Sequence, residues 1–469
     1  MGITSRLAEF VRRTSFEDLP PKVVARSKDM MINAAAVGLA GAAQPEGQAI
    51  TSFVQGMRGN GKCTIIGMGL RTSPVYAALA NGLMIHLLDF DDEAIRRGAH
   101  PSSAIFPVVM SLGEMNGYSG KDVLTAFALG CEVFTKLGAI GSLGEVETIG
   151  GGPLARRGWD LDGVAGTIGA TAAAAKLLEL GQEQLETAFG LAAGESAGVR
   201  ANLATPGKAF QCGRAAMNGI MAALLAQKGF AAARDAVEAP DGLLQCFTPQ
   251  FPPLAKGDYR GVDEGSFFAQ LGYPYDIIHP GVALKVYPCE LAAHPSIDAM
   301  LQLVQQYRPS PGQVAAIGVS VTPGVASLLP YSNPQTGRQA KLCLNYLMAA
   351  TLLYGQPLLN HFTDEAVGDS RLRELMARVS VAAAEAATTL TPRPSTVTLT
   401  LTDGRALRHR VEFARGYPEL PLSNEELDAK FLYCTRYILP PDHIEGAIEQ
   451  FRNLENVKDV TALASILGG

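Results

Sequence analysis

The stretch AGTIGATAAAAKLLEL (residues 165–180), with its counterpart GRAAMNGIMAALLAQKG (213–229), decides the fold that we expect for this chain. Both stretches place glycine and alanine among larger apolar residues at helical spacing. Small side chains let neighbouring helices approach closely, although each glycine adds conformational entropy to the unfolded chain. We therefore predict a large, tightly packed bundle of helices, in which these glycines serve packing and not ligand binding.

Helical patterns extend outward from these stretches in both directions. Residues 22–41 and 121–138 carry apolar side chains at positions i, i+3 and i+4. Ser73 and Pro74 supply an N-cap and a first-turn proline for a helix that runs towards Asp89. The tail from residue 424 to the end is helical in pattern as well. We expect this tail to rejoin the helices of the first half.

A different pattern begins near Tyr273. Residues 313–322 are rich in β-branched side chains, and residues 395–402 and 405–413 alternate around Asp403-Gly404. An Asp-Gly pair between two alternating runs is a strong signal for a β-hairpin. A helix over residues 337–354 lies between these strands in the sequence. The predicted fold is mainly α with an α+β second domain: a large all-helical domain from both chain ends (1–275 and 413–469) and a smaller α+β lid (276–412).

Composition and charge narrow the class of protein. With 469 residues, 47% of them hydrophobic and 18% charged, the chain is long enough for two or three globular domains. Its formal net charge of −6 offers no basic face to nucleic acid. The seven cysteines are scattered without a CxxC pair, which favours a reducing compartment. Because no signal peptide or membrane-spanning run is recognisable, we expect a cytoplasmic protein that binds a small molecule, not a membrane.

The first of three polar clusters follows the helix that starts after Ser73. Acids near the C-terminal end of a helix are slightly unfavourable, because the helix dipole favours cations there. Their presence at this position indicates a functional role. We interpret Asp89 and His100 as acid–base groups. Arg96 and Arg97 are candidates for binding an anion.

Other members of this cluster have a plainer interpretation. For Asp91 and Asp92 we favour a solvated charged loop. His86 fits a core histidine whose hydrogen bonds are satisfied. Among residues that could bind a metal, only Asp89, Asp91, Asp92 and His100 cluster, without the symmetry of a ligand set, so we expect no required metal ion.

The second cluster surrounds Lys208, just before an Ala-rich helix over residues 215–227. A lysine at the start of a helix is electrostatically disfavoured, because the dipole there favours anions. Beside an anionic substrate, however, the lysine and the helix amides would converge on a carboxylate. The alternative is an exposed lysine in a loop.

The third cluster contains Lys285 and Glu290 in a proline-bent loop, where functional side chains often lie. His294 precedes Pro295, and we interpret it as a structural helix cap. Lys341 and Tyr346 form a further candidate pair on the predicted helix of the α+β unit. A tyrosine near lysines can act as a general acid, although core packing explains Tyr346 equally well.

Four motifs in this order resemble the MmgE/PrpD family. They are HxxDFDDE with HPSSAIFPV, GRAAMNGIMAA after a lysine, KxYPC with HPSIDA, and GYPELPLSNEELDAKF. The resemblance spans nearly the whole chain. The family includes 2-methylcitrate dehydratase, cis-aconitate decarboxylase and iminodisuccinate epimerase.

This resemblance implies a helical domain with an α+β lid, an active site between the two domains, a homodimer and no organic cofactor. Carried over motif by motif, it implies that the pocket is lined by Asp89, His100, Lys208, Lys285 and Tyr346.

Three positions depart from the family pattern. After Gly158-Trp159 the family usually has a histidine, where this chain has Asp160. Three residues after the pocket lysine it often has a histidine, where this chain has Gln211. After KxYPC the decarboxylases have a histidine, where this chain has Glu290. Fewer cationic groups favour a less anionic substrate than methylcitrate or cis-aconitate, or one that carries an amine.

The chemistry expected from the resemblance is proton transfer beside a carboxylate. The first hypothesis is a cofactor-free hydro-lyase acting on a small hydroxy-carboxylate. The alternatives are an epimerase or isomerase of an amino- or imino-dicarboxylate, a decarboxylase, and a family member without activity. The catalytic set would be Asp89, His100, Asp160, Lys208, Lys285 and Tyr346, and the substrate-binding set Glu93, Arg96, Arg97, Gln211, Glu290 and Lys341.

Overall fold

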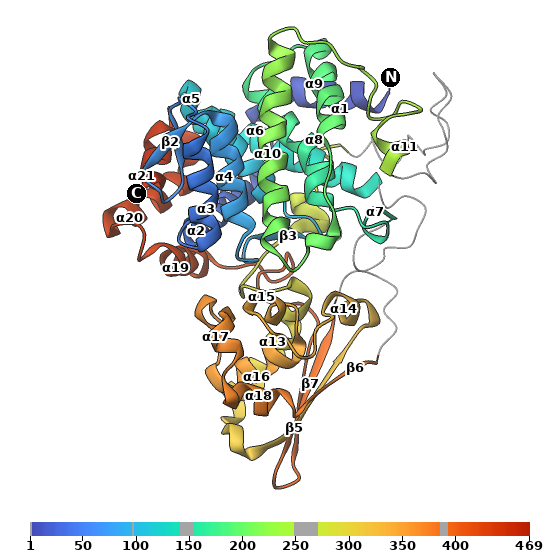
Figure 1. The fold of residues 1–469 in the computed structure, drawn as a ribbon, viewed down its shortest axis with the longest axis vertical. Coiled ribbons are helices and arrows are strands. Elements are labelled where there is room, and N and C mark those ends of the chain that lie inside the picture. The colour runs from blue at the N-terminus through green and yellow to red at the C-terminus, as the bar shows by residue number, and fades with distance from the viewer. Residues whose placement is uncertain (1, 96–97, 141–152, 248–270, 385–392) are drawn as a thin grey trace.

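The computed structural model describes residues 2–95, 98–140, 153–247, 271–384 and 393–469, which form two lobes (Figure 1). One hydrophobic core joins residues between Ile3 and Leu284 to residues between Leu427 and Leu467, and another joins residues between Val286 and Leu401. We call residues 2–284 and 424–469 the helical lobe, and residues 286–411 the α+β lobe. The predicted fold class, mainly α with an α+β second domain, is confirmed, whereas the domain boundaries at 275/276 and 412/413 stay predictions.

In the helical lobe, α10 (Pro206–Gln227) packs between α4 (Pro74–His86) and α8 (Leu161–Leu177). A β-carbon on Gly213 would lie 2.2 Å from the carbonyl oxygen of Leu79, and one on Gly219 would lie 2.5 Å from the β-carbon of Ala170. Only glycine permits such close packing, so these positions serve helix contact as predicted. Among the described residues, the remaining α-helices before residue 284 are α1 (Ile3–Arg13), α2 (Pro21–Ala42), α3 (Pro45–Gly56), α5 (Pro101–Asn116), α6 (Gly120–Ile140), α7 (Pro153–Arg156), α9 (Gln182–Glu195) and α11 (Leu243–Phe247).

Two short antiparallel strand pairs interrupt the helices of this lobe. The first joins β1 (Cys63–Ile65) to β2 (Leu70–Thr72). The second joins β3 (Asp92–Ala94) to β4 (Val282–Leu284), with Glu93 opposite Ala283. The second pair matters for function, because it brings the polar cluster after α4 next to the segment that leads into the α+β lobe.

The α+β lobe has a four-stranded sheet in the order β6 (Val379–Ala383), β5 (Val314–Val321), β7 (Ser395–Leu401) and β8 (Ala406–Val411). The predicted hairpin is confirmed, since β7 and β8 pair antiparallel with Ser395 opposite Val411, and Gly404 takes a positive φ of 89° in the turn. The sheet pairs β5 (Val314–Val321) in parallel with β6 (Val379–Ala383) and antiparallel with β7 (Ser395–Leu401), which continues into β8 (Ala406–Val411).

The single helix predicted over residues 337–354 is in fact two helices, α15 (Gly337–Ala340) and α16 (Leu344–Tyr354). The chain is extended at Cys343, with φ of −131°, and the Cys343 sulfur accepts a hydrogen bond from the Tyr346 N–H at the start of α16. The break lets the chain change direction directly after Lys341. The other helices of this lobe are α13 (His294–Tyr307), α14 (Pro323–Leu328), α17 (Asp364–Val367) and α18 (Ser370–Met376).

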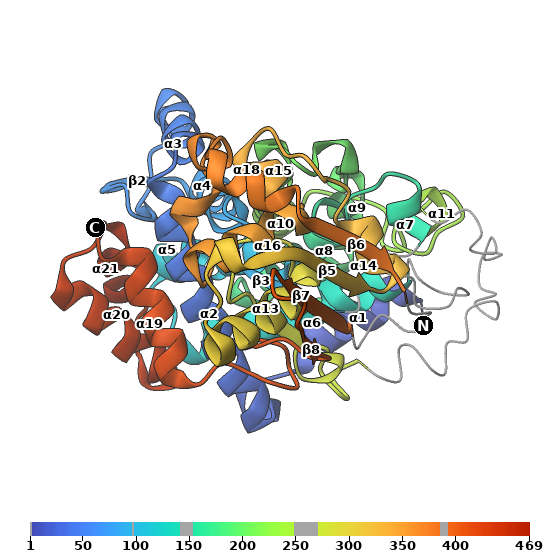
Figure 2. The same cartoon turned by 90° about the horizontal axis from the view of Figure 1, so that it is seen from below.

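The C-terminal tail returns to the helical lobe, as predicted. Its helices are α19 (Asn424–Thr435), α20 (Pro441–Arg452) and α21 (Thr461–Gly468). They pack beside α2 and α5, as the red and blue ribbons of Figures 1 and 2 show. Both chain ends therefore contribute to one core. Among the described residues, none of the helices has the length and apolar character needed to cross a membrane.

Lys430 of α19 ties this tail to the middle of the molecule. Its ammonium group donates hydrogen bonds to Asn33 Oδ1 (2.6 Å) and to the carbonyl oxygens of Phe90 (2.7 Å) and Lys285 (2.6 Å). It also lies 3.7 Å from the centre of the Phe90 ring, a cation–π contact. Burial lowers the pKa of Lys430 to about 7. Only the protonated form has the three N–H donors that these acceptors need.

Replacing Lys430 by methionine should destabilise the helical lobe by about 2–3 kcal/mol, because buried acceptors then lose their donor. The measurement is urea unfolding at pH 6, where the folded wild type carries the charge. Lys121→Met is the matched control, since the Lys121 side chain is half exposed and its ion pair with Glu17 contributes little. Equal stability of the two variants would contradict the structural role of Lys430.

Candidate active site

Four helix ends meet where the two lobes adjoin. His86 is the last residue of α4, His100 precedes α5, Asp162 lies in the first turn of α8, and Lys208 lies in the first turn of α10. Three of these ends are N-termini, whose amide groups and dipoles favour negative charge. The arrangement therefore stabilises carboxylates at this point of the molecule.

Asp89 occupies a strained position directly after α4. Its φ of 52° lies in the left-handed region, which few non-glycine residues adopt. Its N–H donates to the carbonyl oxygen of His86 at 3.2 Å. Residues held in such conformations often cluster at functional sites, where the surrounding structure fixes them. The bend turns the chain away from the axis of α4 and into the junction between the lobes.

Asp89 and Lys285 form the central ion pair, joined by a hydrogen bond from Lys285 Nζ to Asp89 Oδ1. Burial opposes both charges, but the pair outweighs it. The pKa of Lys285 is raised by the carboxylates of Asp89 and Glu93, and the pKa of Asp89 is lowered by Lys285 and Lys208. Asp89 is consequently a carboxylate and Lys285 an ammonium. The Lys285 side chain is buried, whereas 22% of the Asp89 side chain remains exposed.

His86 is a neutral imidazole between a lysine and an acid. Burial, followed by the charge of Lys208, lowers its pKa. Its Nε2 lies 2.8 Å from Lys208 Nζ and its Nδ1 lies 2.8 Å from Asp91 Oδ2. Because an ammonium can only donate, Nε2 is the acceptor and Nδ1 carries the proton that is donated to Asp91. His86 and Asp91 together orient the ammonium of Lys208.

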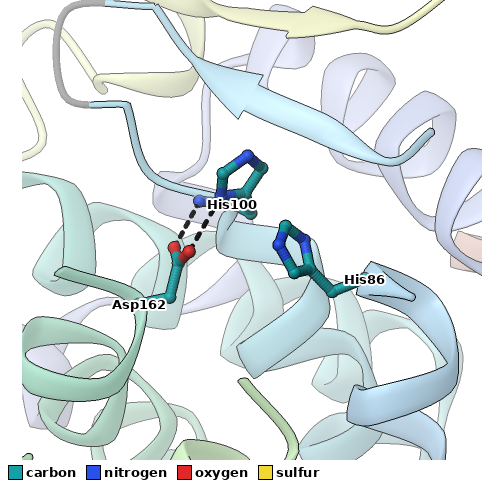
Figure 3. A group of neighbouring side chains, drawn as sticks. All are labelled: His86, His100 and Asp162. Atoms are coloured by element: carbon teal, nitrogen blue, oxygen red, sulfur yellow. Dashed lines mark hydrogen bonds and ion pairs between the residues drawn. The ribbon is translucent and has the colours of Figure 1, made fainter. Parts of the chain in front are cut away.

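His100 has the opposite charge state, although its ring centre is only 4.3 Å from that of His86. Its N–H donates to Asp162 Oδ1 at 2.7 Å and its Nδ1 bonds to Asp162 Oδ2 at 2.8 Å (Figure 3). Burial and Lys208 lower the pKa of His100, but Asp162 outweighs them and raises it to about 9. At neutral pH His100 is therefore an imidazolium, a group that can donate a proton.

A cleft between the lobes is lined by some of these side chains, whereas His100 and Lys285 lie outside its lining. The sequence candidates that it gathers are Asp89, Lys208, Glu290 and Lys341. His86, which we interpreted as a core histidine, is buried and hydrogen-bonded but also faces this cleft. Its lining consists of His86, Leu87, Asp89, Leu203, Ala204, Thr205, Lys208, Ala209, Glu290, Arg338, Lys341 and Leu342.

The two candidates from the α+β side of the cleft have shifted pKa values. Burial, followed by the charge of Glu93, raises the pKa of Glu290, which favours its neutral form. The same carboxyl group accepts a hydrogen bond from the Ala292 N–H at 3.3 Å. Burial lowers the pKa of Lys341 to about 8. Its Nζ donates to the carbonyl oxygen of Leu88, so Lys341 spans the junction.

Other predicted site residues lie near the cleft without lining it. Glu93 is buried behind Lys285, at 4.0 Å, and pairs with Arg393 at 3.3 Å. Asp160 caps α8 through a hydrogen bond from the Gly163 N–H, and burial followed by Asp162 raises its pKa to about 6. Their contact with a substrate stays a prediction.

Gln211 and Tyr346 do not line the cleft either. Gln211 Oε1 accepts a hydrogen bond from the Val199 N–H at 2.6 Å. The Tyr346 hydroxyl donates to the carbonyl oxygen of His361, and its ring belongs to the core of the α+β lobe. Core packing is thus the role that the structure gives Tyr346. Arg96 and Arg97 lie outside the described residues.

Two expectations about neighbouring residues are wrong. Asp91 and Asp92 do not form a solvated loop, because both are completely buried. Asp91 bonds to His86, and Asp92 accepts hydrogen bonds from the Ser102 hydroxyl (2.5 Å) and N–H (3.3 Å) at the start of α5. His294 does not cap α13 but is its first helical residue.

The second cluster also differs from the interpretation of a lysine in a loop. Lys208 lies inside α10, which begins at Pro206 and not near residue 215, because Thr205 caps it through a hydrogen bond from the Gly207 N–H. Only 16% of the Lys208 side chain is exposed. The alternative of an exposed lysine is therefore wrong.

Sequence patterns did not reveal Asp162, Arg338, Arg393 or Lys430 as parts of this region. Asp162 offered one signal, an acid in the first turn of a helix. The other three reach the junction from segments hundreds of residues away from Asp89 along the chain. No local pattern distinguishes them from surface cations.

Two groups of three side chains have donor atoms close enough to hold a metal ion, within 4.8 Å of one another: His86, His100 and Asp162, and Asp89, Asp91 and His100. The ammonium of Lys208 lies 2.8 Å from His86 Nε2 and 3.9 Å from Asp162 Oδ2. A divalent cation here would meet that positive charge at close range. Lys208 already supplies the counter-charge that a metal would bring, so our expectation of no required metal stays a prediction.

Comparison with known proteins places this geometry in context. Residues 5–254 match the MmgE/PrpD N-terminal domain and residues 287–456 match the MmgE/PrpD C-terminal domain. The cis-aconitate decarboxylases of Mus musculus and Homo sapiens are each 27% identical to all of this chain, over 94% and 95% of their own lengths. A cis-aconitate decarboxylase-like protein of Aspergillus oryzae is 25% identical to all of this chain, over 98% of its length.

The pKa of Lys341 predicts how the cleft responds to pH. Below about 8 this side chain is charged and attracts a carboxylate, whereas above that pH it is neutral. We expect the affinity for succinate, measured by isothermal titration calorimetry, to fall as pH rises from 7 to 10. Lys341→Arg keeps its charge throughout this range and should flatten the profile. An identical decline in wild type and variant would contradict the assignment.

Proposed function

The chain belongs to the MmgE/PrpD family, and on this premise we propose that it is a cofactor-free lyase that removes water from a small hydroxy-carboxylate. Its full-length relatives are cis-aconitate decarboxylases, which supports a lyase-type function in general. One observation carries the choice of reaction. A carboxylate oxygen of the ionised Asp89 and a ring nitrogen of the protonated His100 lie within 4.8 Å of each other, beside several ammonium groups.

Removal of water needs both a proton acceptor and a proton donor. The substrate carboxylate binds to the ammonium groups of Lys208 and Lys285. This contact draws positive charge away from Asp89, so the affinity of Asp89 for a proton rises. Asp89 then accepts the proton from the carbon beside the carboxylate, and His100 supplies the proton that leaves with the hydroxyl group as water. The two ammonium groups stabilise the negative charge that develops on the carboxylate.

Decarboxylation is the second candidate, and the full-length match to cis-aconitate decarboxylases favours it. The same ammonium groups would hold the remaining carboxylates while carbon dioxide leaves. The resulting carbanion needs a proton donor, which His100 provides, but no proton acceptor. Asp89 is therefore essential to dehydration and dispensable for proton transfer in decarboxylation.

We expect Lys285→Ala and His100→Ala each to reduce turnover by about 100-fold or more, because each removes a charge used in the reaction. Proton NMR in deuterium oxide follows methylcitrate, cis-aconitate, citrate, malate-like hydroxy acids and N-substituted aspartates. A new vinyl signal with loss of water identifies a dehydratase, and loss of carbon dioxide identifies a decarboxylase. Exchange beside the carboxylate without a vinyl product identifies an epimerase.

The controls for this screen separate the candidates further. Lys228→Ala, an exposed position at the end of α10, should keep full activity. Circular dichroism must show that the inactive variants remain folded. Asp89→Asn should abolish dehydration but retain measurable decarboxylation. Full activity of Lys285→Ala or His100→Ala removes that residue from the mechanism.

We also propose a cytoplasmic homodimer. Exposed apolar side chains on α3 and α10 support self-association: Phe53 and Met57 are 52% and 47% exposed, and Phe210 and Leu225 are 42% and 37% exposed. Residues of both helices belong to the same small apolar cluster. All seven cysteines are free, which agrees with a reducing compartment.

The dimer can be tested by light scattering coupled to size-exclusion chromatography. Wild type should elute at twice the mass of the chain, and Phe53→Asp with Phe210→Asp should shift it towards monomer, because burying a carboxylate at an interface is costly. Tyr437→Asp changes an aromatic residue that is 87% exposed just after α19, and should leave the mass unchanged. A monomeric wild type would contradict the proposal.

A further inference from the structure

Three cations from beyond residue 284 contact three consecutive residues of the helical lobe. Lys285 bonds to the carboxylate of Asp89, and Lys341 Nζ donates to the carbonyl oxygen of Leu88. Arg338 Nη1 lies 3.5 Å from the carbonyl oxygen of Leu87. The contacts thus form a row that runs outward from Asp89, with Arg338 at its far end.

Arg338 also faces the cleft and holds an ion pair across the two lobes. Its Nη2 lies 2.6 Å from Oε1 of Glu46, in the first turn of α3. Both side chains are 32% exposed. An ion pair that is this accessible to water contributes little free energy. A carboxylate inside the cleft can therefore take the place of Glu46 at little cost.

The chemistry of a guanidinium suits such an exchange. Its planar fork presents five N–H donors and matches the two oxygens of a carboxylate. Within the described part of the chain, the contacts of Arg338 are those with Glu46 and Leu87. The α-carbons of Leu87 and Asp89 are at most about 7 Å apart, and Arg338 contacts the first of these residues while Lys285 contacts the second. This separation suits a second carboxylate on a short carbon chain.

We propose that Arg338 is a specificity-determining residue, which binds the substrate carboxylate remote from the reacting carbon, and that Glu46 competes for the same guanidinium. This inference rests on the proposed function and names its substrate class: compounds with at least two carboxylates. The substrate then bridges the lobes, with one carboxylate at Lys208 and Lys285 and another at Arg338. Glu46 makes binding selective for a second carboxylate, because a compound with one carboxylate gains no contact with Arg338 by displacing Glu46.

The test measures binding instead of turnover, with succinate and butyrate as probes. They share a four-carbon chain and differ in the second carboxylate. We expect wild type to bind succinate more tightly than butyrate in isothermal titration calorimetry at pH 7. Arg338→Gln should weaken succinate binding about tenfold or more and leave butyrate unchanged. Glu46→Gln should strengthen succinate binding several-fold, because the competitor for Arg338 has lost its charge.

Arg371→Gln is the matched control, since Arg371 is also in the α+β lobe and pairs with an acid, Asp369, at 2.7 Å, but does not line the cleft. It should change neither affinity. Succinate binding that survives Arg338→Gln but is lost in Lys285→Ala would overturn this inference and leave the proposed function intact. Failure of wild type to bind either probe would overturn both, because the proposed reaction requires a carboxylate site.

Discussion

The ammonium group of Lys430 satisfies a constraint on which the whole junction depends: buried carbonyl oxygens must find donors. Lys430 meets the carbonyl oxygens of Phe90 and Lys285, which belong to the two segments that carry Asp89 and the site lysine itself. Within the described residues no helix or strand ladder supplies these donors, and α19 brings Lys430 to both oxygens. The contacts of Lys430 therefore connect three features of the fold. These are the return of the chain to its first lobe, the pairing of β3 with β4, and the position of the central ion pair.

Neighbouring buried charges then set the protonation states of the site. His86 and His100 have rings 4.3 Å apart, yet one is neutral and the other charged. The difference arises because His86 accepts a hydrogen bond from the ammonium of Lys208, whereas His100 donates two hydrogen bonds to the carboxylate of Asp162. Environments that push pKa values apart divide acid and base roles between groups of the same kind. Glu290 and Lys341 follow the same logic, since burial favours the neutral form of each.

The α+β lobe changes the charge of the cleft from what residue types alone implied. Asp160 and Glu290 replace histidines of the family pattern. From these replacements we expected a less anionic substrate. In the structure Asp160 is a helix cap outside the lining, and burial followed by the charge of Glu93 raises the pKa of Glu290, which favours its neutral form. Meanwhile Arg338 and Lys341 contribute positive charge from the opposite wall. The cleft is thus better suited to polycarboxylates than its acidic substitutions suggested.

By itself, the sequence determined the features that depend on local pattern. Small residues at helical spacing predicted the close packing of α8 and α10, Ser73 with Pro74 predicted the start of α4, and Asp403-Gly404 predicted the hairpin, because each signal lies within a few residues of the element it forms. The clusters around Asp89, Lys208 and Lys285 were also recognisable. Tertiary structure alone decided that Asp91 and Asp92 are buried, that Tyr346 packs in a core, and that Arg338, Arg393 and Lys430 meet the site. Burial and pairing depend on distant neighbours, such as Phe90 and Lys430, which are 340 residues apart along the chain, and a local pattern carries no information about which distant segment will supply them.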